Sequence, residues 1–219
     1  MMPSSANSDA RTAIFASIRE NLAASAPFDK VRKSELDLAV PTSRPPASAD
    51  LRGTFAQSLE MVGANCVVVD SENEGAEQLG NIVRGLAGKK VVVSDSDLVH
   101  RLAETAGIDA IKTASRDELF SADIGITSAQ WVIAETGTLV LESGAESHRL
   151  VSLVPPVHVC VLKSGSIRQT MAEILELANT DTNPTITFIT GASRTSDIEL
   201  TLAIGVHGPR ELHVIVIKD

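Results

Sequence analysis

The chain has 219 residues, 43% of them hydrophobic, and this composition fits one globular domain of ordinary to large size, or a domain with an arm. Its formal net charge of −9 argues against a nucleic-acid-binding protein, because phosphate contacts need clustered Lys and Arg side chains. The sequence contains neither an apolar run of about twenty residues, which a membrane-spanning helix needs, nor the basic and apolar regions of a secretory signal, so we expect a cytoplasmic protein.

The cysteines argue against redox chemistry in this chain. Cys66 and Cys160 both lie in apolar, β-branched stretches, which predicts buried thiols rather than a disulfide. Two thiolates are too few for an ordinary iron–sulfur cluster. The histidines show none of the HxH, HxxxH or HExxH spacings that are typical of a local metal site. We therefore expect no cofactor and no metal in this chain.

The first fifty residues predict a helix followed by an extended arm. Residues 11–24 place Ile14, Phe15, Ile18 and Leu22 on one helical face. Residues 26–50 contain four prolines and few large apolar side chains, which is typical of a loop or linker. We assign residues 1–50 to this arm and residues 51–219 to the domain.

From Asp50 to Asp123 the chain alternates helical and strand patterns. Such alternation predicts βαβ units and a parallel sheet. Asp50 is placed to cap the first of these helices. The expected helices are 51–62, 74–86, 96–106 and 117–120, and the expected strands are 66–69, 91–93 and 108–111.

After Asp123 the predicted strands follow one another with little room for helices. This spacing indicates hairpins, and therefore an antiparallel or mixed portion of the sheet. The expected strands are 124–133, 137–141, 149–153 and 157–162, and a helix is expected at 166–178. The fold class that results is α/β, with a parallel-rich mixed sheet flanked by helices.

The last thirty residues predict strand, turn, helix, turn and strand. An apolar strand ends at Gly191, and Ser196 with Glu199 is typical of a capping box for a short helix that Gly205 would end. A strand that turns into a helix N-terminus directs free N–H groups to one place and favours an anion. Arg194 in this turn could bind a carboxylate or phosphate through two hydrogen bonds. The alternative is a capped loop in which Arg194 is structural.

Three further turns carry polar side chains, each with a functional and a structural interpretation. His207 in the Gly205–Arg210 turn could be a general acid or base, or a loop histidine that bonds the backbone. Glu135 could be a base, nucleophile or ligand anchor, or part of a plain hairpin turn. Arg149 could help to neutralise a ligand, or pair with a nearby acid. We expect the Glu135, Gly191 and Gly205 turns to surround one cleft, since α/β sheets place ligand sites at such turns.

Several motifs in order closely resemble the LUD-domain family, and within it the short members without ferredoxin-type cysteines. The resemblance covers roughly residues 10–219, is densest after residue 120, and departs from the family at Ala192, where a proline is usual. The motifs are Asp123–Thr127, Ile133–Leu141, Arg149–Pro155 followed by His158, Thr190–Glu199 and Gly205–His213.

The resemblance implies a NagB/RpiA/CoA-transferase-like fold and a role in L-lactate utilisation. It implies that this chain is one of three proteins that together oxidise lactate to pyruvate, and that the other two carry the iron–sulfur clusters. A stand-alone acyl or CoA transferase that uses Glu135, or a scaffold without catalysis, remain alternatives. We expect Glu135 and His207 as catalytic residues. The expected ligand-binding residues are Thr136, Gly137, Thr138, Gly191, Ser193, Arg194, Thr195, Asp197, Gly208 and Arg210.

Overall fold

The computed structural model describes residues 5–24, 50–86, 90–143, 149–177, 185–195, 203–204 and 208–219. By its internal contacts the chain divides into two units, Met1–Pro45 and Pro46–Asp219. In the first unit α1 (Ser5–Ala24) contains the predicted helix and exposes Ile14, Phe15 and Ile18. The predicted arm lies outside the described residues, apart from Asp50. No helix in the described ranges is long and apolar enough to cross a membrane.

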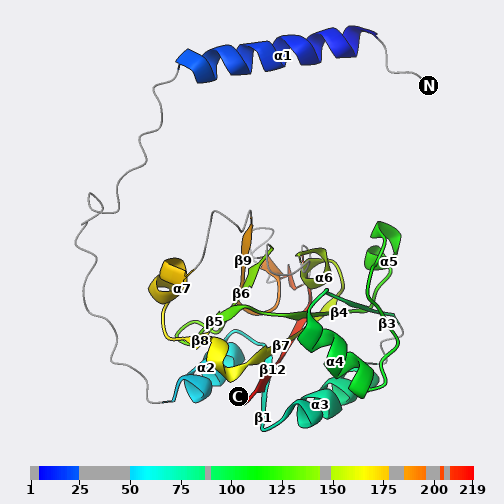
Figure 1. The fold of residues 1–219 in the computed structure, drawn as a ribbon, viewed down its shortest axis with the longest axis vertical. Coiled ribbons are helices and arrows are strands. Elements are labelled where there is room, and N and C mark those ends of the chain that lie inside the picture. Colours follow the sequence, from blue (N-terminus) through cyan, green and yellow to red (C-terminus); the bar gives the residue numbers. More distant parts are fainter. Residues whose placement is uncertain are drawn as a thin grey trace. The chain divides into compact units, whose positions relative to one another are not determined.

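A parallel sheet forms the centre of the second unit (Figure 1). Its apolar, β-branched strands are typical of strands that are covered on both faces. The C-terminal strand β12 lies inside the sheet, where it pairs in parallel with β1 on one side and β7 on the other. The order is β1 (Asn65–Val69), β12 (Glu211–Ile217), β7 (Val157–Lys163), β4 (Ile124–Ser128), β2 (Val91–Val93) and β3 (Ala110–Ile111).

Two amphipathic helices cover one face of this sheet. α3 (Glu72–Gly85) begins after Ser71, whose hydroxyl accepts a hydrogen bond from the Glu74 N–H at 3.2 Å. α4 (Asp97–Thr105) packs beside it. Their buried side chains, which include Leu79 and Leu102, form one apolar cluster with alternate residues of the central strands.

The opposite face is covered by a second sheet and by short helices. The strand order of the second sheet is β8 (Ile167–Arg168), β5 (Trp131–Ile133), β6 (Thr138–Glu142) and β9 (Ile186–Ile189). Strand β6 runs antiparallel to both of its neighbours. α2 (Leu51–Met61), capped by Asp50, buries Phe55 and Leu59 in the cluster between the sheets. α5 (Arg116–Phe120) and α6 (Arg149–Leu153) pack further along the same face, and α7 (Met171–Leu177) packs on the second sheet.

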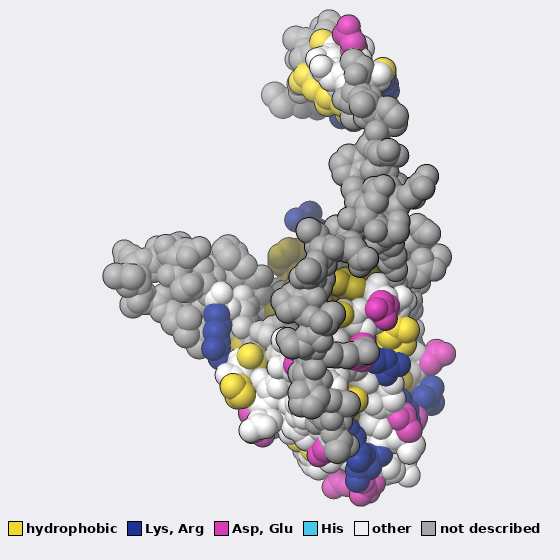
Figure 2. Space-filling model, turned by 90° about the vertical axis from the view of Figure 1, so that its left-hand side faces the viewer, with side chains coloured by type: hydrophobic (Ala, Val, Ile, Leu, Met, Phe, Trp, Pro, Cys, Tyr) yellow, Lys and Arg dark blue, Asp and Glu magenta, His cyan; other side chains and the backbone are white. Residues whose placement is uncertain are grey.

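The predicted α/β architecture, with a parallel-rich sheet, flanking helices and an antiparallel portion, is confirmed. On the face shown in Figure 2, acidic and basic side chains are interspersed, so the negative net charge does not gather into one patch there.

Three expectations about the middle of the chain are wrong. Residues 149–153 form helix α6 rather than a strand, because a short apolar run has no periodicity that separates a strand from a buried helical turn. The long strand predicted at 124–133 is two strands, β4 and β5, which belong to different sheets. The helix predicted at 166–178 begins only at Met171, because β8 pairs with β5 before it.

The prediction of a short helix between Ser196 and Gly205 is wrong for Ala203 and Ile204. Ala203–Ile204 (β11) pairs antiparallel with Arg194–Thr195 (β10), so these two residues form a strand where the end of a helix was expected. Pairing between strands satisfies the backbone groups that a helix would satisfy locally, and the capping pattern in the sequence does not exclude it. Residues 196–202 and 205–207 lie outside the described residues.

The contact between α6 and β4 is testable at Gly125. A Cβ atom added to Gly125 would lie 2.0 Å from the Val151 carbonyl oxygen. We expect Gly125→Ala to lower the free energy of unfolding by about 1–3 kcal/mol, as overpacking commonly does. The measurement is chemical unfolding followed by circular dichroism.

Gly85→Ala is the matched control, since a Cβ added there meets nothing within 4 Å. We expect its stability to stay the same or to rise by less than about 1 kcal/mol. Equal stability of Gly125→Ala and the unchanged protein would contradict this close contact of α6 with β4.

Candidate functional site

A histidine in the centre of the sheet marks the candidate site. His158 is the second residue of β7 and is 1% exposed. Its neighbours in register are Gly125 of β4 and Leu212 of β12. Its Nε2 atom lies 2.8 Å from the hydroxyl oxygen of Thr127. Because Gly125 lies against Val151 of α6, and alternate residues of a strand share a face, both polar side chains lie on the face that α6 covers.

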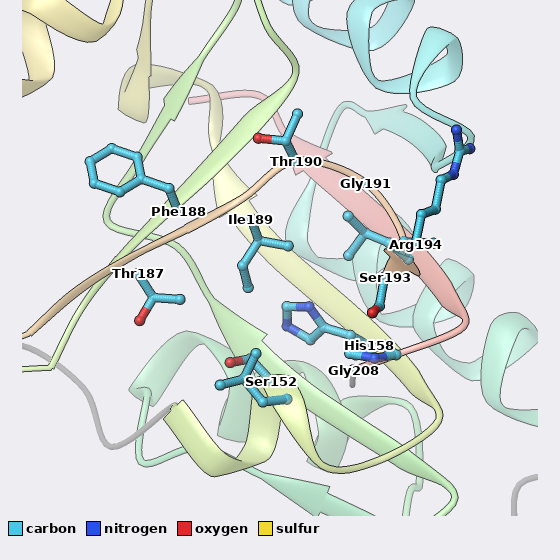
Figure 3. A pocket seen from close by; sticks show the side chains of 14 residues that line it. Ser152, His158, Thr187, Phe188, Ile189, Thr190, Gly191, Ser193, Arg194 and Gly208 are labelled. Carbon is cyan, nitrogen blue, oxygen red and sulfur yellow. The ribbon is translucent and has the colours of Figure 1, made fainter. Parts of the chain in front are cut away.

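A cavity of about 280 Å³ opens over His158. It lies between the end of α6, strand β9 with the turn that follows it, and the segment that leads into β12. Figure 3 shows Ser152, His158, Ile189 and Ser193 around this space, while the ring of Phe188 extends away from it. The lining residues are Ser152, Leu153, His158, Thr187–Arg194, Gly208, Pro209 and Leu212. The volume is slightly below the usual range of drug-sized pockets and fits a small organic molecule.

The lining combines hydrogen-bonding groups with aliphatic ones. Ser152, Thr187 and Ser193 bring hydroxyl groups to the cavity beside the imidazole of His158. Leu153, Ile189 and Leu212 contribute aliphatic surface. Hydroxyl and imidazole groups can donate hydrogen bonds to the oxygens of an anion, while the aliphatic surface can bury a methyl group. The arrangement therefore fits a small carboxylic acid with a short apolar end.

Backbone contacts hold the walls of the cavity in place. The Ser193 N–H donates to the Pro209 carbonyl at 2.9 Å, which ties the Gly191 turn to the segment before β12. The Ser152 hydroxyl donates to the Arg149 carbonyl at 3.1 Å and so stays within α6. Gly191 has a φ of 80°, and a Cβ there would lie 2.7 Å from the Val62 carbonyl oxygen, so this turn packs directly on the end of α2.

The turn that contains Glu135 lies beside the Gly191 turn. Hydroxyl oxygens of Thr136 and Thr138 are 2.7 Å apart, and the Thr138 hydroxyl lies 2.7 Å from that of Thr190. Thr190 lines the cavity, but residues 135–138 do not. Glu135 and Thr136 are exposed. The structure thus brings these two predicted turns together, with Glu135 on the outside of the cavity.

Gly137 has a structural role in this turn. Its φ is 64°, and a Cβ there would lie 2.7 Å from the Leu59 nitrogen. The Ser58 hydroxyl donates to the Glu135 carbonyl at 3.4 Å. Both contacts pack the turn against α2.

Arg194 extends to α2. Its Nη2 atom donates to the carbonyl oxygen of Val62, the C-cap residue of that helix, at 2.8 Å. Figure 3 shows the guanidinium pointing away from His158. The contact favours the structural interpretation of Arg194, with a helix carbonyl as its partner rather than an acid.

The other predicted site residues are spread around the cavity. Gly208 lines it, and Thr195 lies in β10. Arg210 is exposed outside the lining, and its backbone N–H donates to the Pro156 carbonyl at 2.7 Å. Asp197 and His207 lie outside the described residues.

Thr127, Ser152 and His158 lie in the motifs that carry the family resemblance, but neither they nor Thr187 were among the expected site residues. A polar residue inside an apolar strand was the available signal for His158, but the face to which it points depends on the neighbouring strands. Ser152 was hidden because its segment was expected to be a strand.

The sequence predicts two buried thiols, which is confirmed for Cys160, while Cys66 is half-buried. Cys160 is fully buried. Burial, with a smaller effect of Glu60, raises the pKa of the Cys66 thiol from 9.0 to about 11. In the described ranges no group of three or more His, Cys, Asp or Glu side chains lies close enough to hold a metal ion.

We expect both thiols to react slowly in the folded protein. At pH 8 the Cys66 thiol is protonated, because its pKa is about 11, and the thiolate is the reactive form. The measurement is labelling with a disulfide reagent at pH 8, with and without denaturant. If both thiols were labelled as fast in the folded protein as in denaturant, the fold would not protect them, and this prediction would be wrong.

We expect Arg194→Ala to destabilise the fold, because it removes the hydrogen bond to Val62. The expected loss in the free energy of unfolding is about 1–2 kcal/mol, within the range for a bond to a charged group. Arg52→Ala is the control. Arg52 is an exposed arginine of α2, the helix that Val62 caps, and its side chain has no hydrogen bond within the described part of the chain. Unchanged stability of Arg194→Ala, together with a loss of ligand binding, would instead assign Arg194 to an anion site.

Comparisons with known proteins identify the family of this chain. The LUD domain family model matches residues 53–217. "Lactate utilization protein C" of Deinococcus radiodurans is 33% identical over 183 residues, which cover 81% of this chain and 84% of that protein. The protein of the same name from Anoxybacillus flavithermus is 34% identical, over 78% of this chain and 72% of its own. A crystal structure of a DUF162 family protein from Deinococcus radiodurans superposes with a TM-score of 0.57 at 27% identity, over 78% of this chain and 99% of that one. The chain therefore belongs to the LUD domain family.

Proposed function

We propose that this chain is the non-redox subunit of an L-lactate utilisation system and binds a small carboxylate over His158. Its relatives are named for lactate utilisation, and the similarity extends over most of both chains. The observation that carries the proposal is the cavity itself. It places the imidazole of His158 and several hydroxyls beside aliphatic side chains, in a volume of about 280 Å³.

Lactate and pyruvate share the features that this cavity can accommodate. Each has a carboxylate and an adjacent oxygen, which can accept hydrogen bonds from hydroxyl groups such as those of Thr187 and Ser193. Each also has a methyl group, which can pack against Leu153 and Ile189. A buried imidazole strengthens such binding because hydrogen bonds gain strength where water is excluded.

Electron transfer belongs to other subunits in this proposal. Cys160 is buried and Cys66 is half-buried in the sheet, and two thiols are too few for a cluster ligand set. The iron–sulfur clusters would lie in cytoplasmic partner proteins, and this chain would contribute binding and positioning of the small acid.

We expect anaerobically purified protein to contain no stoichiometric iron or sulfide. The reason is that only two cysteines are present in the whole chain. Iron and acid-labile sulfide are measured by colorimetric analysis, with an iron–sulfur partner as the positive control. Cluster iron in this chain alone would overturn the division of roles.

Calorimetric titration with L-lactate and pyruvate tests the binding step. We expect Thr187→Val to weaken binding about tenfold, because one hydrogen bond to a charged group is worth about 1.5–3 kcal/mol. Thr105→Val is the matched control, since Thr105 is an exposed threonine at the end of α4 outside the cavity lining. His158→Gln should also weaken binding, provided that its circular dichroism shows a folded protein.

Lactate-dependent dye reduction with the iron–sulfur partners tests the system. We expect activity only when this chain and its partners are combined, and less activity with Thr187→Val than with Thr105→Val. Equal affinities and activities of these two variants would exclude the cavity as the carboxylate site.

Acyl or CoA transfer through Glu135 is the competing function. Glu135 is exposed in its turn and does not line the cavity. The Glu135 carboxylate is therefore not part of the cavity over His158. Mass spectrometry after incubation with acyl-CoA distinguishes the two functions, since a covalent adduct on Glu135 that is absent from Glu135→Gln would establish transfer and overturn the proposal.

A further inference from the structure

A second cavity lies on the other side of α6. Its volume is about 420 Å³. It forms where β2 and β3 end at the same edge of the sheet, with α5 and the beginning of α6 as walls. The lining residues are Val93, Asp95, Lys112, Thr113, Ala114, Leu119 and Arg149–Val151. The ends of parallel strands are a common place for ligands in α/β folds. None of these residues lines the cavity over His158.

Two cationic side chains stand at this cavity in a chain whose net charge is negative. Arg149 is exposed, and its guanidinium has no hydrogen bond or ion pair within the described part of the chain. Lys112 binds Glu104 at 2.7 Å and holds the pKa of that carboxyl below its usual value. An ammonium group has three N–H donors, so Lys112 can still donate to a ligand. Two cations near one another favour an anion with two negative charges over a single carboxylate.

A buried hydroxyl group lies on the same side of the sheet. Ser94 follows β2, and its N–H continues the strand pairing by donating to the Ile126 carbonyl at 3.0 Å. Its side chain therefore shares a face with Val92, which packs against Leu119 and Val151 of the cavity. Ser94 is 1% exposed, and its hydroxyl has no hydrogen-bond partner among the described residues. A buried polar group without a partner is costly. Ser94 does not line the cavity itself, so its hydroxyl lies near the proposed ligand site and is not one of its contacts.

The remaining polar groups indicate what else the ligand carries. Thr113 adds a hydroxyl to the lining. Asp95 adds a carboxylate, which repels an anion unless the ligand also presents a hydrogen-bond donor. Hydroxyl groups on the ligand would supply such donors. The apolar side chains of Leu119 and Val151 form the base, while the side chain of Val93 packs on the opposite face of the sheet.

We propose that this cavity is a second ligand site, which binds a small phosphate monoester bearing hydroxyl groups. The guanidinium of Arg149 binds two phosphate oxygens, the geometry for which arginine is suited. Lys112 and Thr113 contact the phosphate from the β3 side, and Asp95 accepts a hydrogen bond from a ligand hydroxyl. The site is separate from the carboxylate cavity and does not depend on a role in lactate utilisation.

Calorimetric titration of the full chain with glycerol 3-phosphate, inorganic phosphate and glycerol tests the proposal. We expect saturable binding of glycerol 3-phosphate, weaker binding of inorganic phosphate and none of glycerol. Arg149→Ala should weaken glycerol 3-phosphate binding at least tenfold, and Arg149→Lys should restore part of it. Lys112→Ala, at an exposed position, tests the same site if Arg149→Ala disturbs α6.

Arg116→Ala is the matched control. Arg116 is an exposed arginine of the neighbouring helix α5, stacks over Phe120 at 5.5 Å and does not line the cavity. We expect its affinity for glycerol 3-phosphate to equal that of the unchanged protein. Absence of saturable phosphate binding, or equal losses in Arg116→Ala and Arg149→Ala, would overturn the proposal. Equal affinity for glycerol 3-phosphate and inorganic phosphate would remove the role of the ligand hydroxyls.

Discussion

The absence of a side chain at Gly125 is the constraint on which both cavities depend. It allows the Val151 carbonyl of α6 to lie directly on β4, closer than any other residue at that position would permit. α6 then divides the face of the sheet. Its first three residues line one cavity, and Ser152 and Leu153 line the other. A helix of five residues thus determines the width of two candidate sites.

The second constraint is the position of the C-terminal strand. β12 lies between β1 and β7, so the segment that enters it must pass the amino-terminal end of β7, where His158 lies. The Ser193–Pro209 hydrogen bond holds the Gly191 turn against this segment. Arg194, by its bond to Val62, ties the same turn to α2. Parts of the chain that are far apart in sequence therefore meet around one small cavity.

The arrangement suits binding more than redox chemistry. The cavity over His158 offers hydroxyls, an imidazole and aliphatic surface, while the cysteines are in the sheet with a raised pKa at Cys66. Polar groups at such a site gain strength from burial, which favours a small ligand that satisfies them. Under the proposed function, partner proteins carry the clusters and this cavity contributes the binding of the small acid.

The sequence alone determined the class of fold and much of its element order, because β-branched runs and helical periodicity are local signals. It also determined the capping of α2 by Asp50 and the burial of Cys160. Tertiary structure decided which strands share a sheet, since β4 and β5 have similar patterns but different partners. It decided that residues 149–153 are helical, because only packing on Gly125 distinguishes that helix from a strand. It also decided the candidate site: the sequence shows that His158 lies in a strand, but the neighbours in register, Gly125 and Leu212, decide what the imidazole faces.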